Sequence, residues 1–230
     1  LDPEEFLDQA DIVVFALYPH IMIDWIHEHQ NAFRPGTLLT DVSGVKVNVA
    51  DKVQSFLRDD VEFIAAHPMA GRETSGIEYA NTEMFHDANY IIVPTEKNTK
   101  EAVETSRQLA EILQFHHIAT LSMQEHDEMI GFLSQLTHVI AVSLMNTHDN
   151  SHLVEYTGDS FRDLTRIAKI NETMWSELFL LNKKILLSEI DAFAKELEHF
   201  RDTLAKEDVD EMKRLFIQST ERRKKFVKLK

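Results

Sequence analysis

Three polar segments of this 230-residue chain each follow a short apolar run, and their side chains are of types that can transfer protons or bind ligands. They are Tyr18-Pro19, the stretch from Asp41 to Lys46, and the stretch from His67 to Gly76. Histidine titrates near neutral pH and is the most common general base, so His67 is the first candidate for proton transfer. Glu73, six residues on, is placed to orient or tune the imidazole. The alternative is a structural histidine at the end of a strand.

Ser43 stands beside a glycine in the second segment. Its hydroxyl is suited to hydrogen-bond a ligand or His67. Ser43 and Asp41 also suit the N-cap of a following helix, since a short polar side chain accepts from the first backbone N–H groups. The two roles are compatible, and both remain open from the residues alone.

A long helical stretch in the second half carries a stripe of small and polar residues: Asp127, Gly131, Ser134 and His138. Spacings of four, three and four residues place them on one helix face. This face predicts a pocket wall from which His138 projects. The alternative is a core histidine with its hydrogen bonds satisfied inside the protein.

Arg166 adjoins the apolar face of a shorter helix that spans about residues 160–169. A guanidinium suits bidentate binding of a carboxylate, so Arg166 is a candidate for a substrate carboxylate. The alternative is an ion pair with Asp163. Trp25 and Trp175 are more often core residues than ligand contacts. No pair of histidines has convincing metal-ligand spacing, so no metal site is predicted.

The elements that must hold these residues follow from hydrophobic patterning. Short apolar runs predict five strands, at 11–17, 37–40, 61–66, 89–93 and 117–120, with the first buried on both faces, and helices at 20–31, 45–57 and 100–114. Alternating strands and helices indicate a mainly parallel sheet. Ligands bind at the carboxyl ends of such strands, so all three polar segments should meet at one edge.

From about residue 122 only helices are predicted, at 122–146, about 160–169, 172–204 with a break, and 207–226. The expected fold class is therefore α/β followed by all-α. Residues 1–120 would form part of a Rossmann-type dinucleotide-binding domain, and residues 121–230 a helical domain for substrate binding and dimerisation. The helix at 122–146 is apolar all round and needs cover on every side. A homodimer through the helical half would supply that cover.

Composition narrows the classes of function. The chain is 43% hydrophobic and 27% charged, an ordinary globular balance. Its net charge of −15 argues against nucleic-acid binding. The chain contains no cysteine, which fits a reducing cytoplasm and excludes disulfides and a cysteine nucleophile. No apolar run approaches about 20 residues, so no membrane span is expected.

Four blocks, in order and spacing, resemble the prephenate and arogenate dehydrogenase family over essentially the whole chain. They lie at residues 41–46, 67–76, 136–141 and 161–168, the last followed by Met174-Trp175. The resemblance implies oxidative decarboxylation of prephenate to 4-hydroxyphenylpyruvate in tyrosine biosynthesis, with hydride transfer to NAD; NADP is not excluded.

The resemblance also implies roles. His67 resembles the catalytic histidine, with Ser43 beside it, and Arg166 resembles the arginine that binds the ring carboxylate. His138 resembles a substrate-side histidine, Glu73 a gating or polarising glutamate, and Trp175 an aromatic residue near the site. The strand ends that carry Pro19, Asp41 and Ser43 are expected to bind the cofactor.

The chain departs from the family pattern in several places. The family opens with a strand and a glycine-rich turn for the pyrophosphate, and none of the six glycines here forms it, so an N-terminal segment is expected to be missing. Many relatives have Gly-Ser where this chain has Ser43-Gly44, and many have a run of glycines at residues 158–160. Some relatives have a histidine where this chain has Gln135. Three alternatives therefore remain: arogenate as substrate, another two-domain hydroxyacid dehydrogenase, and a non-catalytic helical dimerisation or regulatory module.

Overall fold

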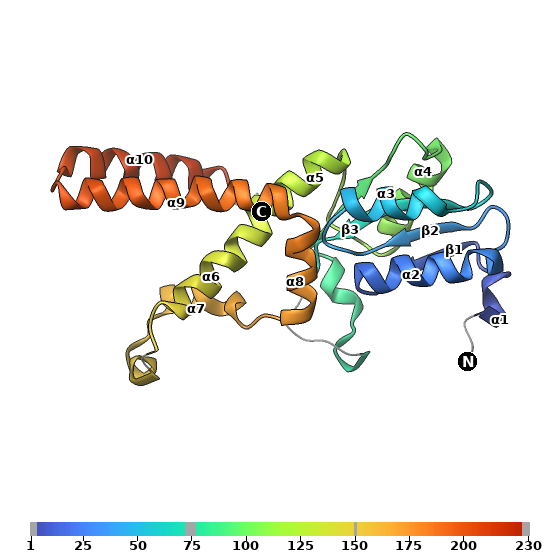
Figure 1. Cartoon of the computed structure of the whole chain (residues 1–230), viewed down its shortest axis with the longest axis horizontal. Coiled ribbons are helices and arrows are strands. Elements are labelled where there is room, and N and C mark those ends of the chain that lie inside the picture. Colours follow the sequence, from blue (N-terminus) through green and yellow to red (C-terminus); the bar gives the residue numbers. More distant parts are fainter. Residues whose placement is uncertain (1–3, 72–76, 150, 227–230) are drawn as a thin grey trace. The chain divides into compact units, whose positions relative to one another are not determined.

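The computed structural model describes residues 4–71, 77–149 and 151–226 (Figure 1). Glu73 lies outside these residues. The chain divides into two compact units, Leu1–Leu186 and Leu187–Lys230, and each is considered by itself. The boundary expected near residue 120 falls inside the first unit and stays a prediction.

The first unit contains a five-stranded sheet in the order β1-β2-β3-β4-β5. Three of its pairings are parallel, and only the pairing of β3 with β4 is antiparallel. The five predicted strands are thus confirmed, and β1, β2 and β3 end at the same edge. Their bounds are Ile12–Phe15 for β1, Leu38–Asp41 for β2, Glu62–Pro68 for β3, Asn89–Val93 for β4 and His117–Thr120 for β5.

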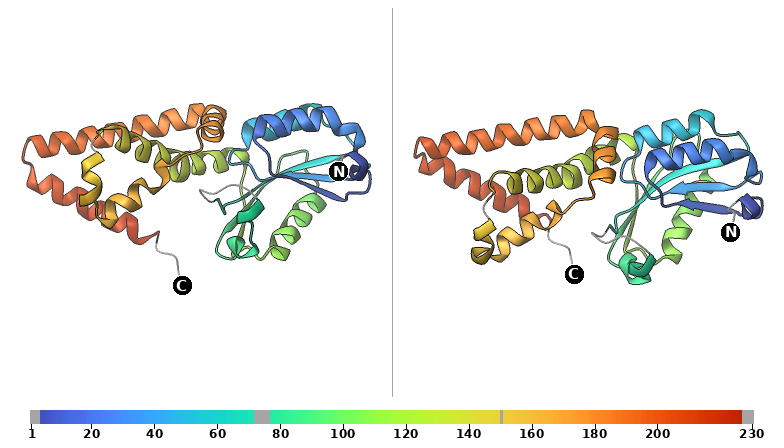
Figure 2. Two further views of the ribbon diagram at one scale, coloured as in Figure 1. Left: turned by 90° about the horizontal axis from the view of Figure 1, so that it is seen from below. Right: turned by 60° about the horizontal axis from the view of Figure 1, so that its bottom comes forward.

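Alternating side chains of β3 enter two separate cores, because successive residues of a strand point to opposite faces. Phe63 and Ala65 join the core under helices α2 (Pro19–His29) and α3 (Val47–Phe56). Ile64 and Ala66 join the core under helix α4 (Lys100–Ile112). The left view of Figure 2 shows α2 and α3 on one side of the sheet and α4 on the other.

Strand β1 is not buried on both faces, and that expectation was wrong. Ile12 is 38% exposed and Val14 50%, whereas Phe15 is buried. Within the part of the chain that the structure describes, β1 is an edge strand paired with β2 alone, and α4 packs on β3 and β4. The apolar run therefore marks a strand of the sheet without marking a central one.

The predicted long helix at 122–146 is confirmed as one continuous run of three parts: α5 (Met123–Ile130), a π-helical turn (Gly131–Leu136) and α6 (Thr137–Asn146). Ser122 and Glu125 form a capping box at its start. The run Met123–Asn146 has 24 residues and contains an 18-residue window with a mean hydropathy of 1.4, of which 28% is buried. By length and composition alone it could cross a membrane, but the core helix of a soluble protein meets the same criteria, so the expectation of no membrane span stays a prediction.

Short helices complete the first unit. A 3-10 turn at Ser151–Tyr156 leads to helix α7 (Asp159–Thr165), which continues into a 3-10 turn at Arg166–Ala168. Helix α8 (Glu172–Leu181) follows and packs Leu178 into the core of α2 and α3. The short elements before and within the sheet are α1 (Glu4–Leu7) and 3-10 turns at Gln30–Ala32, Ile77–Tyr79 and Thr82–Phe85.

The predicted break in the helix at 172–204 falls at Asn182, between α8 and α9 (Lys183–Ala205). The second unit is a helical hairpin formed by α9, from Leu187 onward, and α10 (Val209–Lys224). Glu207 makes the turn at φ 53°, and Asp208 caps α10 by accepting from the N–H of Glu211. Phe200 and Phe216 pack across the hairpin with ring centroids 6.1 Å apart.

Candidate active site

A buried ion pair lies at the end of β2. Lys46 Nζ donates to Asp41 Oδ2 at 2.7 Å, and both side chains are fully buried. The other carboxylate oxygen of Asp41 accepts from the backbone N–H of Ala66, the residue before His67, at 3.1 Å. Asp41 therefore joins the loop after β2 to the end of β3, and its predicted role in cofactor binding stays a prediction.

Ser43 belongs to the same cluster. Its hydroxyl donates to Asp41 and lies 3.3 Å from Lys46 Nζ, which donates to it. The structure thus brings Ser43 to Asp41, as their spacing suggests. In the residues described here the Ser43 hydroxyl bonds Asp41 and not the imidazole of His67.

Helix α3 is capped from a distant part of the chain. Asp127 on α5 accepts from the backbone N–H of Lys46 at 2.8 Å and from that of Val47 at 2.9 Å. The proposal that Ser43 or Asp41 caps this helix was therefore wrong, because the helix begins at Val47 and Asp127 binds its first N–H groups. The side chain of Asp127 is 2% exposed, so these bonds are sheltered from water.

His67 lies at the end of β3 and is half-buried. Its Nδ1 is 2.9 Å from Nε2 of His126 on α5, and the two rings meet edge to face with centroids 5.1 Å apart. His126 Nδ1 in turn is 2.8 Å from Oδ1 of Asp127. A continuous chain of hydrogen bonds therefore joins His67 through His126 to Asp127.

Burial and positive neighbours keep these imidazoles neutral. Desolvation holds the pKa of His67 well below 6.5, and Lys46 and His126 lower it further. Desolvation also lowers the pKa of His126, although Asp127 opposes that shift. A neutral imidazole can accept a proton, which is the state that a general base requires.

Hydrogen bonds also join helix α8 to the π-helical turn that follows His126 and Asp127. Asn182 Nδ2 donates to the backbone carbonyl of Asp127 at 3.0 Å and to Oε1 of Gln135 at 2.8 Å. Gln135 Nε2 donates to the carbonyl of Leu178 at 3.0 Å. Gln135, one of the departures from the family pattern, thus joins the turn to α8.

Pro19 is the buried first residue of α2, at the same edge of the sheet as His67. The next N–H, that of His20, donates to the Glu177 carboxylate of α8 at 2.6 Å. Asn171, at the start of α8, donates to the Tyr18 hydroxyl at 3.2 Å. Helix α8 therefore covers the end of β1, and a cofactor role for Pro19 stays a prediction.

The side chains of His138 and Trp175 are in contact. Their ring centroids are 3.7 Å apart, and His138 Nδ1 donates to the backbone carbonyl of Ser134 at 2.9 Å. Arg166 lies in the turn after α7, which packs against α6. The sequence placed these residues near one another only through the family resemblance.

The π-helical turn alters the predicted stripe. Its i→i+5 hydrogen bonds add a residue to the turn, so the faces of α5 and α6 are out of phase with a regular helix. Asp127 points into the start of α3, whereas the His138 ring packs against Trp175 at a tilt of 31°. The sequence analysis assigned no individual role to Lys46 or His126, because neither belongs to a spacing pattern that marks it as a site residue.

Comparison with known proteins agrees with the four sequence blocks. The family description "Prephenate dehydrogenase, nucleotide-binding domain" matches residues 2–118, and "Prephenate dehydrogenase, dimerization domain" matches residues 122–218. Prephenate dehydrogenase of Bacillus subtilis is 33% identical over 184 residues, 78% of this chain and 49% of that protein. The enzyme of Lactococcus lactis is 30% identical over 217 residues, 90% of this chain and 58% of that protein.

Among solved structures, prephenate dehydrogenase of A. aeolicus, crystallised with hydroxyphenyl propionate and NAD+, superposes with a TM-score of 0.87. It is 26% identical, and the match covers 98% of this chain and 79% of that one. The chain spans about half the length of the curated relatives it matches. With both family descriptions matched in order, this chain belongs to the prephenate dehydrogenase family.

Proposed function

We propose that this chain carries the catalytic centre of an NAD-dependent prephenate dehydrogenase, which converts prephenate to 4-hydroxyphenylpyruvate and carbon dioxide. The observation that carries the proposal is the position of His67. It stands at the edge where β1, β2 and β3 end, with Nδ1 held by the buried His126. Nε2, the other ring nitrogen, has no partner among the described residues and is then left for a substrate.

The substrate chemistry explains why a neutral histidine is needed. Prephenate is a cyclohexadienol with a carboxylate on its ring. As hydride leaves C4, the 4-hydroxyl loses its proton, and Nε2 of His67 accepts that proton. The electron pair of the bond to the departing carbon dioxide then moves through the ring to the former hydroxyl oxygen. That oxygen takes the proton back from His67, and the ring becomes aromatic.

The end of the sheet fits the nicotinamide portion of a dinucleotide. Pro19, Ser43 and His67 present neutral groups there, while the charges of Asp41 and Lys46 are buried and paired. Bound NAD would supply the hydride acceptor. The described residues contain no glycine-rich turn for the pyrophosphate, so the fit is to the nicotinamide end alone.

Substrate binding falls to the helical residues in this proposal. Arg166 would bind the ring carboxylate in a bidentate pair. His138 and Trp175, whose rings pack against each other, would form the wall beside the substrate ring. Glu73 keeps its proposed gating role, although it lies outside the described residues.

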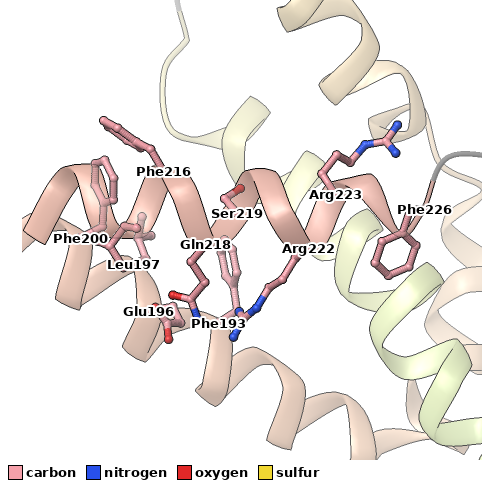
Figure 3. A pocket seen from close by; sticks show the side chains of 11 residues that line it. Phe193, Glu196, Leu197, Phe200, Phe216, Gln218, Ser219, Arg222, Arg223 and Phe226 are labelled. Atoms are coloured by element: carbon pink, nitrogen blue, oxygen red, sulfur yellow. The ribbon is translucent and has the colours of Figure 1, made fainter.

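A homodimer through the helical half accompanies this function. The hairpin exposes apolar side chains on both of its helices, among them Leu197 at 59% and Phe216 at 55%. A groove of about 570 Å³ between α9 and α10 is lined by these two and by Phe193, Phe200 and Phe226 (Figure 3). A second copy would cover this face. A Phe216→Asp variant should then sediment as a lighter species than the parent protein, whereas Lys213→Glu, at an exposed residue of α10 that does not line the groove, should leave sedimentation unchanged.

The decisive assay measures formation of NADH from NAD and of NADPH from NADP, with prephenate and with arogenate as substrate. It should be run on this chain and on the longest natural protein that contains it. Turnover of prephenate with NAD supports the proposal. A preference for arogenate would instead identify the protein as an arogenate dehydrogenase. If the longest protein shows no turnover and binds neither dinucleotide in calorimetry, the alternative of a non-catalytic helical dimerisation module is favoured. A cytoplasmic location, and the absence of membrane or nucleic-acid partners, remain predictions.

A further inference from the structure

We propose that His126 and Asp127 are positioning residues that hold His67 in the tautomer with its proton on Nδ1, leaving Nε2 unprotonated toward the substrate. The inference rests on the proposed function, because it assigns the direction of proton transfer at that site. It is carried by the hydrogen-bond chain from His67 through His126 to Asp127.

Asp127 sets the direction of the chain. Its carboxylate accepts from the backbone N–H groups of Lys46 and Val47, which can only donate. These two bonds fix the carboxylate in place as an acceptor. The nitrogen of His126 that faces it at 2.8 Å must therefore be the donor, so His126 carries a proton on Nδ1.

The protonation of His126 in turn determines the tautomer of His67. A neutral imidazole has one N–H and one acceptor nitrogen, so Nε2 of His126 accepts. The atom facing it at 2.9 Å is Nδ1 of His67, which must then be the donor. A histidine side chain in water favours the other tautomer, with the proton on Nε2, and that form has no lone pair for the substrate hydroxyl.

The surroundings favour a neutral His126. Its side chain is fully buried, which disfavours the charged form. Among the described residues, the charged groups that face the two imidazoles are Asp127, Asp41 and Lys46, and the last two neutralise each other in their ion pair. A protonated His126 would donate from both nitrogens and force the proton of a neutral His67 onto Nε2.

The first test reads the tautomer directly. The protein is labelled with ¹⁵N-histidine, and the ring nitrogens of His67 are assigned by comparison with a His67→Asn variant. At neutral pH we expect His67 and His126 both to be protonated on Nδ1 and unprotonated on Nε2. Protonation of His67 on Nε2 would overturn the proposal, whatever the activity of the protein.

The second test separates positioning from folding. His126→Phe removes the acceptor and should lower kcat by about 10²-fold or more, in line with a triad in which a wrong tautomer costs about 10⁴-fold, with little change in KM. His126→Gln restores an acceptor oxygen and should recover most of kcat and the Nδ1–H signal of His67. If the Gln variant is as slow as the Phe variant while His67 keeps the Nδ1–H tautomer, the proposed role is wrong.

The exposed His116 provides the matched control, because His116→Gln should change neither kcat nor the spectrum of His67. The two proposals also fail in different ways. No turnover by the wild-type protein contradicts the proposed function while the tautomer can still be read. Turnover with His67 protonated on Nε2 contradicts only the hydrogen-bond chain.

Discussion

The carboxylate of Asp127 accepts from the backbone N–H of Val47, 80 residues away in sequence, at 2.9 Å. This bond joins the long helix of the second half to the first turn of α3, beside the end of the sheet. The same carboxylate ends the hydrogen-bond chain to His67. One side chain thus contributes both to the stability of the fold and to the chemistry proposed for the site.

Replacing His67 should remove the general base. His67→Ala is expected to lower kcat by about 10²–10⁴-fold and to leave KM for prephenate nearly unchanged, because proton transfer matters in the transition state. Steady-state kinetics measures both constants, with His116→Ala as the control. A large rise in KM with an unchanged kcat would reverse the role given to His67.

Replacing Arg166 should weaken binding more than turnover. A charged hydrogen-bonded pair contributes about 1.5–3 kcal/mol, so Arg166→Ala should raise KM by roughly ten- to a hundredfold. Arg162, one turn earlier and paired with Asp159 at 3.2 Å, is the matched control. Equal effects of Arg162→Ala and Arg166→Ala would indicate a general disturbance of α7 instead of a carboxylate site.

Lys46→Met should destabilise the protein, because it leaves the buried Asp41 without its partner. Breaking a buried ion pair on one side costs about 3–5 kcal/mol. Urea unfolding measures the loss, and the double variant Lys46→Met/Asp41→Leu should recover part of it. A single variant within about 0.5 kcal/mol of the parent, the range of ordinary surface substitutions, would contradict the burial of this pair.

Asp127→Ala should lower stability more than the loss of an ordinary cap. Thr99→Ala removes one N-cap bond, to the N–H of Ala102, and should cost about 1 kcal/mol. Asp127→Ala removes the partner of two N–H groups and of His126, so the loss should be about 2–3 kcal/mol. Thermal and urea unfolding of the two variants side by side test this order.

Stability should fall as the pH drops below about 6.5. The pKa values of His67 and His126 are lowered in the folded protein, whereas those of the unfolded chain stay near 6.5. The unfolded chain therefore binds more protons in this window, and the free energy of unfolding falls with pH until the lowered pKa values are reached. His126→Gln should reduce the slope between pH 6.5 and about 5; stability that rises on acidification would contradict the assignment.

Much of the fold follows from local sequence patterns. All five strands and the long helix at 122–146 agree with the structure, because apolar runs and helical periodicity are local properties. The meeting of Asp41 and His67 at one edge also follows, since parallel strands end together. The edge position of β1 does not, because an apolar run looks the same whether or not a neighbour covers it.

The hydrogen-bond chain could not be predicted in the same way. His126 and Asp127 are adjacent polar residues on a helix, and nothing in their spacing shows that they reach His67 and Val47. The π-helical turn at Gly131–Leu136 adds to the difficulty, since it shifts the faces that regular spacing implies. Contacts between residues 59 to 81 positions apart depend on tertiary packing.

The cap that Asp127 places on α3 also restricts how the protein can move. Many enzymes close around their ligands by hinge bending, which requires residues that can absorb a change in backbone angles. Separation of α3 from α5 would leave the buried Asp127 carboxylate and two backbone N–H groups without their hydrogen-bond partners. We therefore expect the junction between α3 and α5 to resist hinge bending, because these two hydrogen bonds would have to break together.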